Sequence, residues 1–172
     1  MEDKKKEEQL IKESASGSKE AFCELYGLYK DYLYRYAYYR LGNPEDAEDA
    51  VSECVLAAWK GIGSLRSSEA FTAWLFRILS NCCAGHIRKA IASREVANQL
   101  EQGSGTDTVQ PSLSVELNEA LSILSDEERE IVLLSVIAGM NSSEISRQIG
   151  VPAGTVRSKL SRSLEKMRSY LS

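Results

Sequence analysis

The sequence predicts an all-α protein made of two small helical domains that a flexible linker joins. Apolar residues recur at helical spacing along most of the 172 residues, and the alternation of apolar and polar residues typical of half-buried strands is absent. Between about residues 96 and 112 this periodicity fails, and the chain becomes polar and rich in glycine and serine. Such a segment has too few apolar side chains to pack. We therefore expect one helical domain on each side of it.

Three helices are expected in order in the first domain. The apolar stripe of the first consists of Phe22, Leu25, Tyr29, Leu33, Tyr36 and Ala37. The second begins at Asn43, a good N-cap residue, with Pro44 at the first helical position. Its apolar face consists of Val51, Cys54, Val55, Ala58 and Trp59. A glycine- and serine-rich break at 61–68 precedes the third, whose inward residues are Phe71, Trp74, Leu75, Ile78 and Cys82.

The second domain is predicted to end in a helix-turn-helix. Leu117, Leu121 and Leu124 mark its first helix. Capping-box patterns at 125–128 and 141–144 open the next two. The inward residues of these two helices are Ile131, Val132, Leu134 and Val136, then Ile145 and Ile149. Gly150 ends the short helix, and the apolar positions of the last helix are Val156, Leu160, Leu164, Met167 and Leu171. A short helix, a tight turn and a longer helix are typical of major-groove readers.

Charge is segregated along a chain whose net charge is −4. Residues 41–58 contain five acidic residues and no basic one, whereas 66–94 contain five basic residues and one acid, and 147–172 contain six basic residues and one acid. Two basic segments suggest two contacts with a polyanion, and the acidic one suggests a different partner. Solvated helix faces would also account for either basic segment taken alone.

The last helix carries the strongest signal for DNA binding. With its apolar residues buried, the opposite face presents Arg157, Ser158, Ser161 and Arg162, flanked by Lys159 and Lys166. Arginine forks onto guanine edges, while serine and lysine mostly contact the backbone. An ordinary helical hairpin with a basic surface is the alternative.

A weaker signal lies between Leu65 and Arg94, where basic residues interleave with aromatic ones. A positive groove with stacking surfaces suits unpaired DNA. Helical spacing assigns Phe71 and Trp74 to the core, so the DNA role is assigned to the preceding loop and to the polar face formed by Arg77, Asn81 and Arg88. The acids near residue 45 stabilise a helix N-terminus. Glu48, Asp49 and Glu53 lie beyond what the first turn requires, and a protein interface is a second explanation for them.

Nothing in the sequence indicates catalysis, a cofactor or membrane insertion. Cys82 and His86 share a helix face, but a zinc site needs about four ligands and the chain has no other histidine. We therefore expect no metal and buried cysteines. No nucleophile–base pair is evident. The charged N-terminus does not resemble a signal peptide, and no apolar run reaches the ~20 residues of a membrane span. These observations predict a cytoplasmic protein.

Taken together, the motifs resemble the extracytoplasmic-function sigma factors, the smallest members of the sigma-70 superfamily. The resemblance extends from about Ala21 to Leu171. Four blocks in this order carry it, at 34–50, 73–81, 124–131 and 144–162, and a polar linker separates the second from the third.

This resemblance implies an alternative sigma factor that binds core RNA polymerase and directs promoter-specific initiation, and that is no enzyme. It implies sigma region 2 over residues 10–94, a flexible linker over 95–114 and the region 4 helix-turn-helix over 115–172. Region 2 would contact the clamp helices of the largest polymerase subunit through Asp46, Glu48, Asp49 and Glu53. It would open the −10 element through Arg77, Asn81, Arg88 and Lys89. Region 4 would meet the flap of the second-largest subunit and read the −35 element through Thr155, Arg157, Ser158, Lys159, Ser161 and Arg162. An anti-sigma factor is a further expected partner.

The family usually carries an acid shortly after the position of Asn81, whereas the run 82–86 of this chain contains none. This run includes Gly85, which weakens a helix interior by about 1 kcal/mol relative to alanine. Two other classes of function are alternatives to a sigma factor. A free-standing helix-turn-helix regulator would need a dimer seam, and a metal or redox sensor would use the cysteines. The two basic segments and the acidic helix favour the sigma factor.

Overall fold

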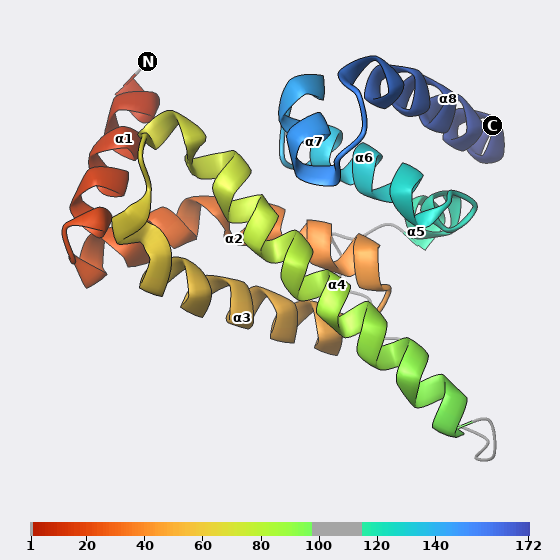
Figure 1. Cartoon of the computed structure of the whole chain (residues 1–172), viewed down its shortest axis with the longest axis horizontal. Coiled ribbons are helices and arrows are strands. Elements are labelled where there is room, and N and C mark those ends of the chain that lie inside the picture. Colours follow the sequence, from red (N-terminus) through yellow and green to blue (C-terminus); the bar gives the residue numbers. More distant parts are fainter. Residues whose placement is uncertain (1, 98–114) are drawn as a thin grey trace.

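The computed structural model describes residues 2–97 and 115–172 of the chain (Figure 1). These residues form eight α-helices and two short 3₁₀ turns, with no strand among them. The predicted all-α class is therefore confirmed. Within these two ranges, no helix is both long and apolar enough to cross a membrane.

The first group of helices consists of α1 (Glu2–Ala15), α2 (Lys19–Leu41), α3 (Pro44–Gly61) and α4 (Phe71–Ala97). Two 3₁₀ turns, Ile62–Ser64 and Ser68–Ala70, form the break between α3 and α4. Fully buried side chains of α2, α3 and α4 make the core, and the largest include Leu33, Tyr36, Phe76 and Leu79. The helix α1 was not foreseen, because nine of its 14 residues are charged and the apolar stripe is short. Its inward residues, Leu10 and Ile11, are buried.

The predicted start of α3 is confirmed. The Asn43 side chain accepts hydrogen bonds from the backbone N–H groups of Glu45 and Asp46 at 2.8 and 3.2 Å. Pro44 occupies the first turn, and Gly42 ends α2 with a φ of 73°. Because a cap is a local interaction, its residues can be read directly from sequence.

The buried face of α4 differs in part from the predicted one. Phe71 and Leu75 are buried as expected, but Leu79 and Cys83 are fully buried as well. Trp74, Ile78 and Cys82 are only partly buried. The reason is that α4 packs against both α2 and α3, so its buried stripe is broad and centred on a slightly different line.

Gly85 does not interrupt α4, which continues to Ala97. A Cβ atom at this position would meet nothing closer than Arg88 Nη2 at 3.8 Å. We therefore expect Gly85→Ala to stabilise the protein by about 1 kcal/mol, through helix propensity alone. The melting temperature should then rise by about 2–4 °C. Gly42→Ala is the matched control, because the φ of 73° at Gly42 disfavours a side chain. It should lower the melting temperature, and a loss of stability in Gly85→Ala would contradict the prediction.

The second group consists of α5 (Val115–Ser122), α6 (Asp126–Val136), α7 (Ser142–Ile149) and α8 (Ala153–Leu171). Both predicted capping boxes are present, at Ser125 and Asn141. Two apolar assignments were wrong. Val136 is 64% exposed, and its place in the core is taken by Leu133, while Leu171 is 49% exposed in the last turn of α8.

The two groups of helices lie against each other, with α6 packed on α2 (Figure 1). The helix α4 continues three residues into the segment predicted as linker, 95–114, and ends at Ala97. The rest of that predicted linker, 98–114, lies outside the described residues.

Candidate nucleic-acid interface

The helix-turn-helix is built by α7 and α8. Gly150 ends α7 with a φ of 80°, a left-handed conformation that glycine adopts without strain. The Ser146 hydroxyl donates a hydrogen bond of 2.5 Å to the carbonyl of Val151, which closes the turn. Ile145 and Val156 are buried where the two helices pack. These contacts fix which face of α8 is presented to solvent.

That face carries most of the residues predicted to read duplex DNA. The exposed ones are Arg157, Ser158, Ser161 and Arg162, and Thr155 is half-buried at the start of α8. Lys159 is different, because its ammonium group lies 2.6 Å from the Glu127 carboxylate of α6. The flanking Lys166 similarly lies 2.9 Å from Glu128. Both lysines therefore tie α8 to the N-terminus of α6.

Glu128 is the centre of this attachment. Its carboxylate accepts a hydrogen bond of 3.0 Å from the Ser125 backbone N–H and contacts the ammonium group of Lys166. These two hydrogen bonds, the first of them foremost, lower the pKa of the Glu128 carboxyl to about 2. Ser163, which is fully buried beneath this point, donates to the same carboxylate at 3.4 Å.

This lowered pKa predicts how acid affects the second group of helices. The unfolded carboxyl has a pKa near ~4.3, so the stabilisation from Glu128 is complete above that pH and disappears as the pH falls towards about 2. Glu128→Gln should therefore lower the melting temperature at pH 7, and the difference from the unsubstituted protein should vanish near pH 2. Thermal melts across this range measure it. An equal loss at both ends would assign the effect to packing.

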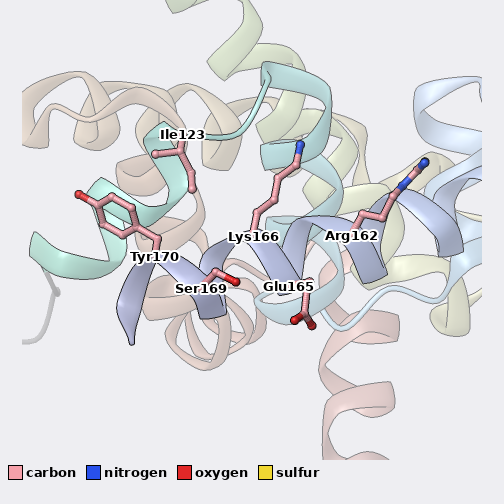
Figure 2. Close-up of a pocket in the computed structure, with 6 residues that line it drawn as sticks. All are labelled: Ile123, Arg162, Glu165, Lys166, Ser169 and Tyr170. Atoms are coloured by element: carbon pink, nitrogen blue, oxygen red, sulfur yellow. The ribbon is translucent and has the colours of Figure 1, made fainter.

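A shallow groove of about 550 Å³ runs along α8 beside α5 (Figure 2). Arg162 and Lys166 line one end, and Ile123 and Tyr170 line the other. Ile123 and Tyr170 are large side chains that remain 46% and 47% exposed. The groove therefore places an open apolar surface directly beside the basic face of α8.

On α4, three of the four residues predicted to contact the −10 element form one stripe. Arg77, Asn81 and Arg88 are all exposed, and their spacing of four and seven residues brings them onto one helix face. Lys89 is exposed too, on a neighbouring face. Phe71 is buried, and its ring centroid lies 5.9 Å from that of the half-buried Trp74. Phe71 therefore belongs to the core, as expected, whereas Trp74 packs against that core and stays partly exposed.

The four acids of α3 that were predicted to contact polymerase fall into two pairs, while the fifth acid of this helix, Glu45, is exposed in its first turn. Glu48 and Asp49 are exposed on the outer face. Asp46 and Glu53 flank His86 of α4, whose ring nitrogens lie 3.9 and 3.3 Å from their carboxylates. Of these four acids, Glu48 and Asp49 are the two that make no ion pair with His86 of α4.

Beside these acids lies an apolar groove of about 450 Å³ that sequence reasoning missed. The N-terminal half of α2 and the C-terminal half of α3 form it, with Phe22, Tyr26, Leu56 and Trp59 among its lining residues. The rings of Phe22 and Trp59 pack with centroids 5.2 Å apart. Leu56 is 56% exposed and lies off the predicted apolar face. An apolar residue out of phase with its helix was the one signal available in the sequence.

The cysteines show no arrangement suited to a metal. In the ranges that the structure describes, no group of three or more histidine, cysteine or acidic side chains is placed to hold an ion. Burial raises the pKa of the Cys83 thiol to about 12, and it also raises the pKa of Cys54. Neutral buried thiols are poor nucleophiles, so neither Cys54 nor Cys83 is suited to redox sensing. Cys23 is exposed and Cys82 is only partly buried, so the expected burial of the cysteines holds for Cys54 and Cys83 alone.

Comparisons with known proteins agree with this layout. The family model for sigma-70 region 2 matches residues 25–92, and the model for sigma-70 region 4 matches residues 114–167. The ECF RNA polymerase sigma factor BldN of Streptomyces coelicolor is 33% identical over 95% of this chain, which spans 65% of the length of BldN. The ECF RNA polymerase sigma factor SigW of Bacillus subtilis is 29% identical over 94% of both chains. Among solved structures, CnrH in complex with the cytosolic domain of CnrY matches 96% of this chain and 97% of its own, with a TM-score of 0.71 and 25% identity.

The chain therefore belongs to the extracytoplasmic-function sigma factors of the sigma-70 family. Proteins of this class are transcription initiation factors. It is an alternative sigma factor, which directs RNA polymerase to specific promoters.

Proposed function

We propose that this sigma factor divides promoter recognition between its two groups of helices, with boundaries near 10–94 and 115–172 and a linker at 95–114. The observation that carries the proposal is the exposed basic face of α8, which the helix-turn-helix holds away from the core. In this proposal Arg157 and Arg162 read base edges in the major groove of the −35 duplex, while Ser158 and Ser161 contact the backbone. Thr155 begins the helix, and Lys159 contacts phosphate only after it leaves Glu127.

The −10 element is assigned to α4 and the turns before it. Arg77, Asn81 and Arg88 provide one continuous polar and basic stripe, and Lys89 extends it sideways. Because unpaired DNA exposes both phosphates and base edges, a stripe of guanidinium and amide groups suits it.

Polymerase docking is assigned to α3 and the apolar groove beside it. Glu48 and Asp49 offer accessible negative charge, and Leu56 and Trp59 offer apolar area next to that charge. The clamp helices of the largest subunit would need basic residues beside bulky apolar ones to match both features. Asp46 and Glu53 join this surface from the side facing α4.

The open apolar end of the α8 groove, at Ile123 and Tyr170, is assigned to the flap of the second-largest subunit.

The protein acts in this proposal as a non-enzymatic factor in the cytoplasm, where it meets RNA polymerase. CnrH was solved with the cytosolic domain of CnrY bound. We propose by analogy that an anti-sigma factor holds this chain too, and that it covers the apolar groove used for polymerase. Such a partner would then exclude polymerase by direct competition.

The test is a pull-down of core polymerase with the full-length protein, followed by run-off transcription from genomic promoter fragments. We expect stable capture of core enzyme and transcripts that depend on the added protein. Binding of DNA as a dimer, without any capture of core enzyme, would instead support a free-standing regulator.

A further inference from the structure

One carboxylate of the second group of helices, that of Glu130, is largely buried against the first group of helices. Glu130 of α6 lies 3.5 Å from Arg40 Nη2 at the end of α2, and it accepts a hydrogen bond from the Ser80 hydroxyl of α4. The side chains of Arg40 and Glu130 are only 8% and 16% exposed. The two groups thus meet through a charge pair that is largely removed from water.

This pair is specific but incompletely bonded. The Nε and Nη1 atoms of Arg40 are buried without a hydrogen-bond partner. Desolvation of a buried pair offsets most of its attraction unless the remaining donors are satisfied. Removing one partner leaves the other charge buried and uncompensated. The contact between Arg40 and Glu130 is therefore better suited to forming and breaking than a permanent apolar core would be.

The same arrangement brings the helix-turn-helix over the beginning of α4. A cavity of about 470 Å³ lies between them, with Trp74 and Arg77 on one side and Arg147 and Gln148 of α7 on the other. Arg77 and Arg147 line this cavity together with the acids Glu69 and Glu144, and the described residues show no ion pair across it. The Gln148 amide nitrogen is buried there without a partner. These features leave Glu130 as the principal polar attachment that the described residues show between the two groups.

We propose that Glu130 is a latch that keeps the free chain closed, with α7 lying across a cavity from the start of the −10 surface. Release of Glu130 from Arg40 and Ser80 separates the two groups and removes α7 from the path of promoter DNA to Arg77, whose side chain is exposed to solvent even in the closed form. The closure itself is independent of the proposed function. Its effect on DNA rests on the −10 role proposed for Arg77.

Small-angle X-ray scattering of the full-length protein tests the closure without DNA. A compact chain of this length has a radius of gyration of about 16 Å. Glu130→Gln keeps an acceptor for Ser80 but leaves Arg40 without its counter-charge, so we expect a radius several ångströms larger. Glu127→Gln is the matched control, because it removes the same charge three residues away on α6 from a pair made within the second group. It should scatter like the unsubstituted protein.

Arg40→Gln and Ser80→Ala provide second routes to the open form, and circular dichroism checks that each variant keeps its helices. If Glu130→Gln and Glu127→Gln scatter alike, or if the unsubstituted chain is already extended, the latch is refuted.

Binding of a labelled −10 fork DNA then tests the consequence. We expect Glu130→Gln to bind at least about fivefold more tightly than Glu127→Gln, as for a typical coupling between two sites. A larger radius with unchanged affinity would overturn the masking of the −10 surface. Failure of the proposed function is recognised separately, because run-off transcription would then be insensitive to Arg77→Ala while the scattering result stands.

Discussion

Replacing Arg157 or Arg162 with alanine is expected to weaken −35-dependent transcription by about 5- to 150-fold. Each arginine projects from the exposed face of α8. An arginine that forks onto a guanine contributes about 1–3 kcal/mol of discrimination, which corresponds to this range. Because neither side chain is buried, the melting temperature should change little. Run-off transcription on a promoter with an intact −35 element, together with thermal melts, measures both effects.

Arg168→Ala is the matched control for this experiment. Arg168 lies on the same helix, carries the same charge, and has a side chain 74% exposed, but it lies on the last turn and pairs with Glu165 at 3.1 Å. Its replacement should leave transcription nearly unchanged. A promoter whose −35 element is scrambled supplies the second control. If Arg157→Ala and Arg162→Ala lose as much activity there, the two arginines act through polymerase or folding and not through base readout.

Neutralising Glu48 and Asp49 together, to Gln and Asn, is expected to weaken binding to core polymerase. The two carboxylates are exposed on α3 near the apolar groove, and neither pairs with His86 as Asp46 and Glu53 do. Exposed helix charges contribute only a few tenths of a kcal/mol each to folding, so the fold should survive. Affinity should fall most at low salt and converge with that of the unsubstituted protein as salt rises, since screening already weakens what the substitution removes.

Titration of labelled protein with core polymerase at low and high salt measures this effect. Glu24→Gln with Asp31→Asn is the matched control, because these acids are exposed on α2 and lie outside the groove. That variant has the same net charge and should bind like the unsubstituted protein. Equal weakening in both variants would mean that overall charge, and not the surface of α3, governs docking.

Local signals in the sequence were sufficient to place most of the helices. Asn43, Ser125, Asn141 and Gly150 each satisfy or terminate a helix end through residues close in sequence, and all four assignments were confirmed. Spacing along α8 also placed Val156 and Met167 in the core and Arg157 on the outside. Periodicity is reliable where one helix face meets one neighbour.

Contacts between residues far apart in sequence were not predictable from pattern. The pairing of Lys159 with Glu127 spans 32 positions, and the contact between Arg40 and Glu130 spans 90. Neither contact can be recognised from the spacing of residues or from composition. Val136 was misassigned because the helix periodicity continues into its last turn, where nothing packs against it. The roles of Arg77, Asn81, Glu48 and Asp49 rest on exposure and charge together with the family, and they remain proposals.

The two acids at the start of α6 also change how the recognition helix interacts with dissolved ions. A protein that neutralises DNA phosphates releases counterions, and its binding weakens with salt by a slope of about 0.9 per phosphate. Glu127 and Glu128 of α6 already serve as internal counterions for Lys159 and Lys166 of α8. While those pairs persist, neither lysine contributes to that slope. The −35 contact then depends more on Arg157 and Arg162 at base edges, and affinity for the duplex varies less with the ionic strength of the cell than the charge of α8 suggests.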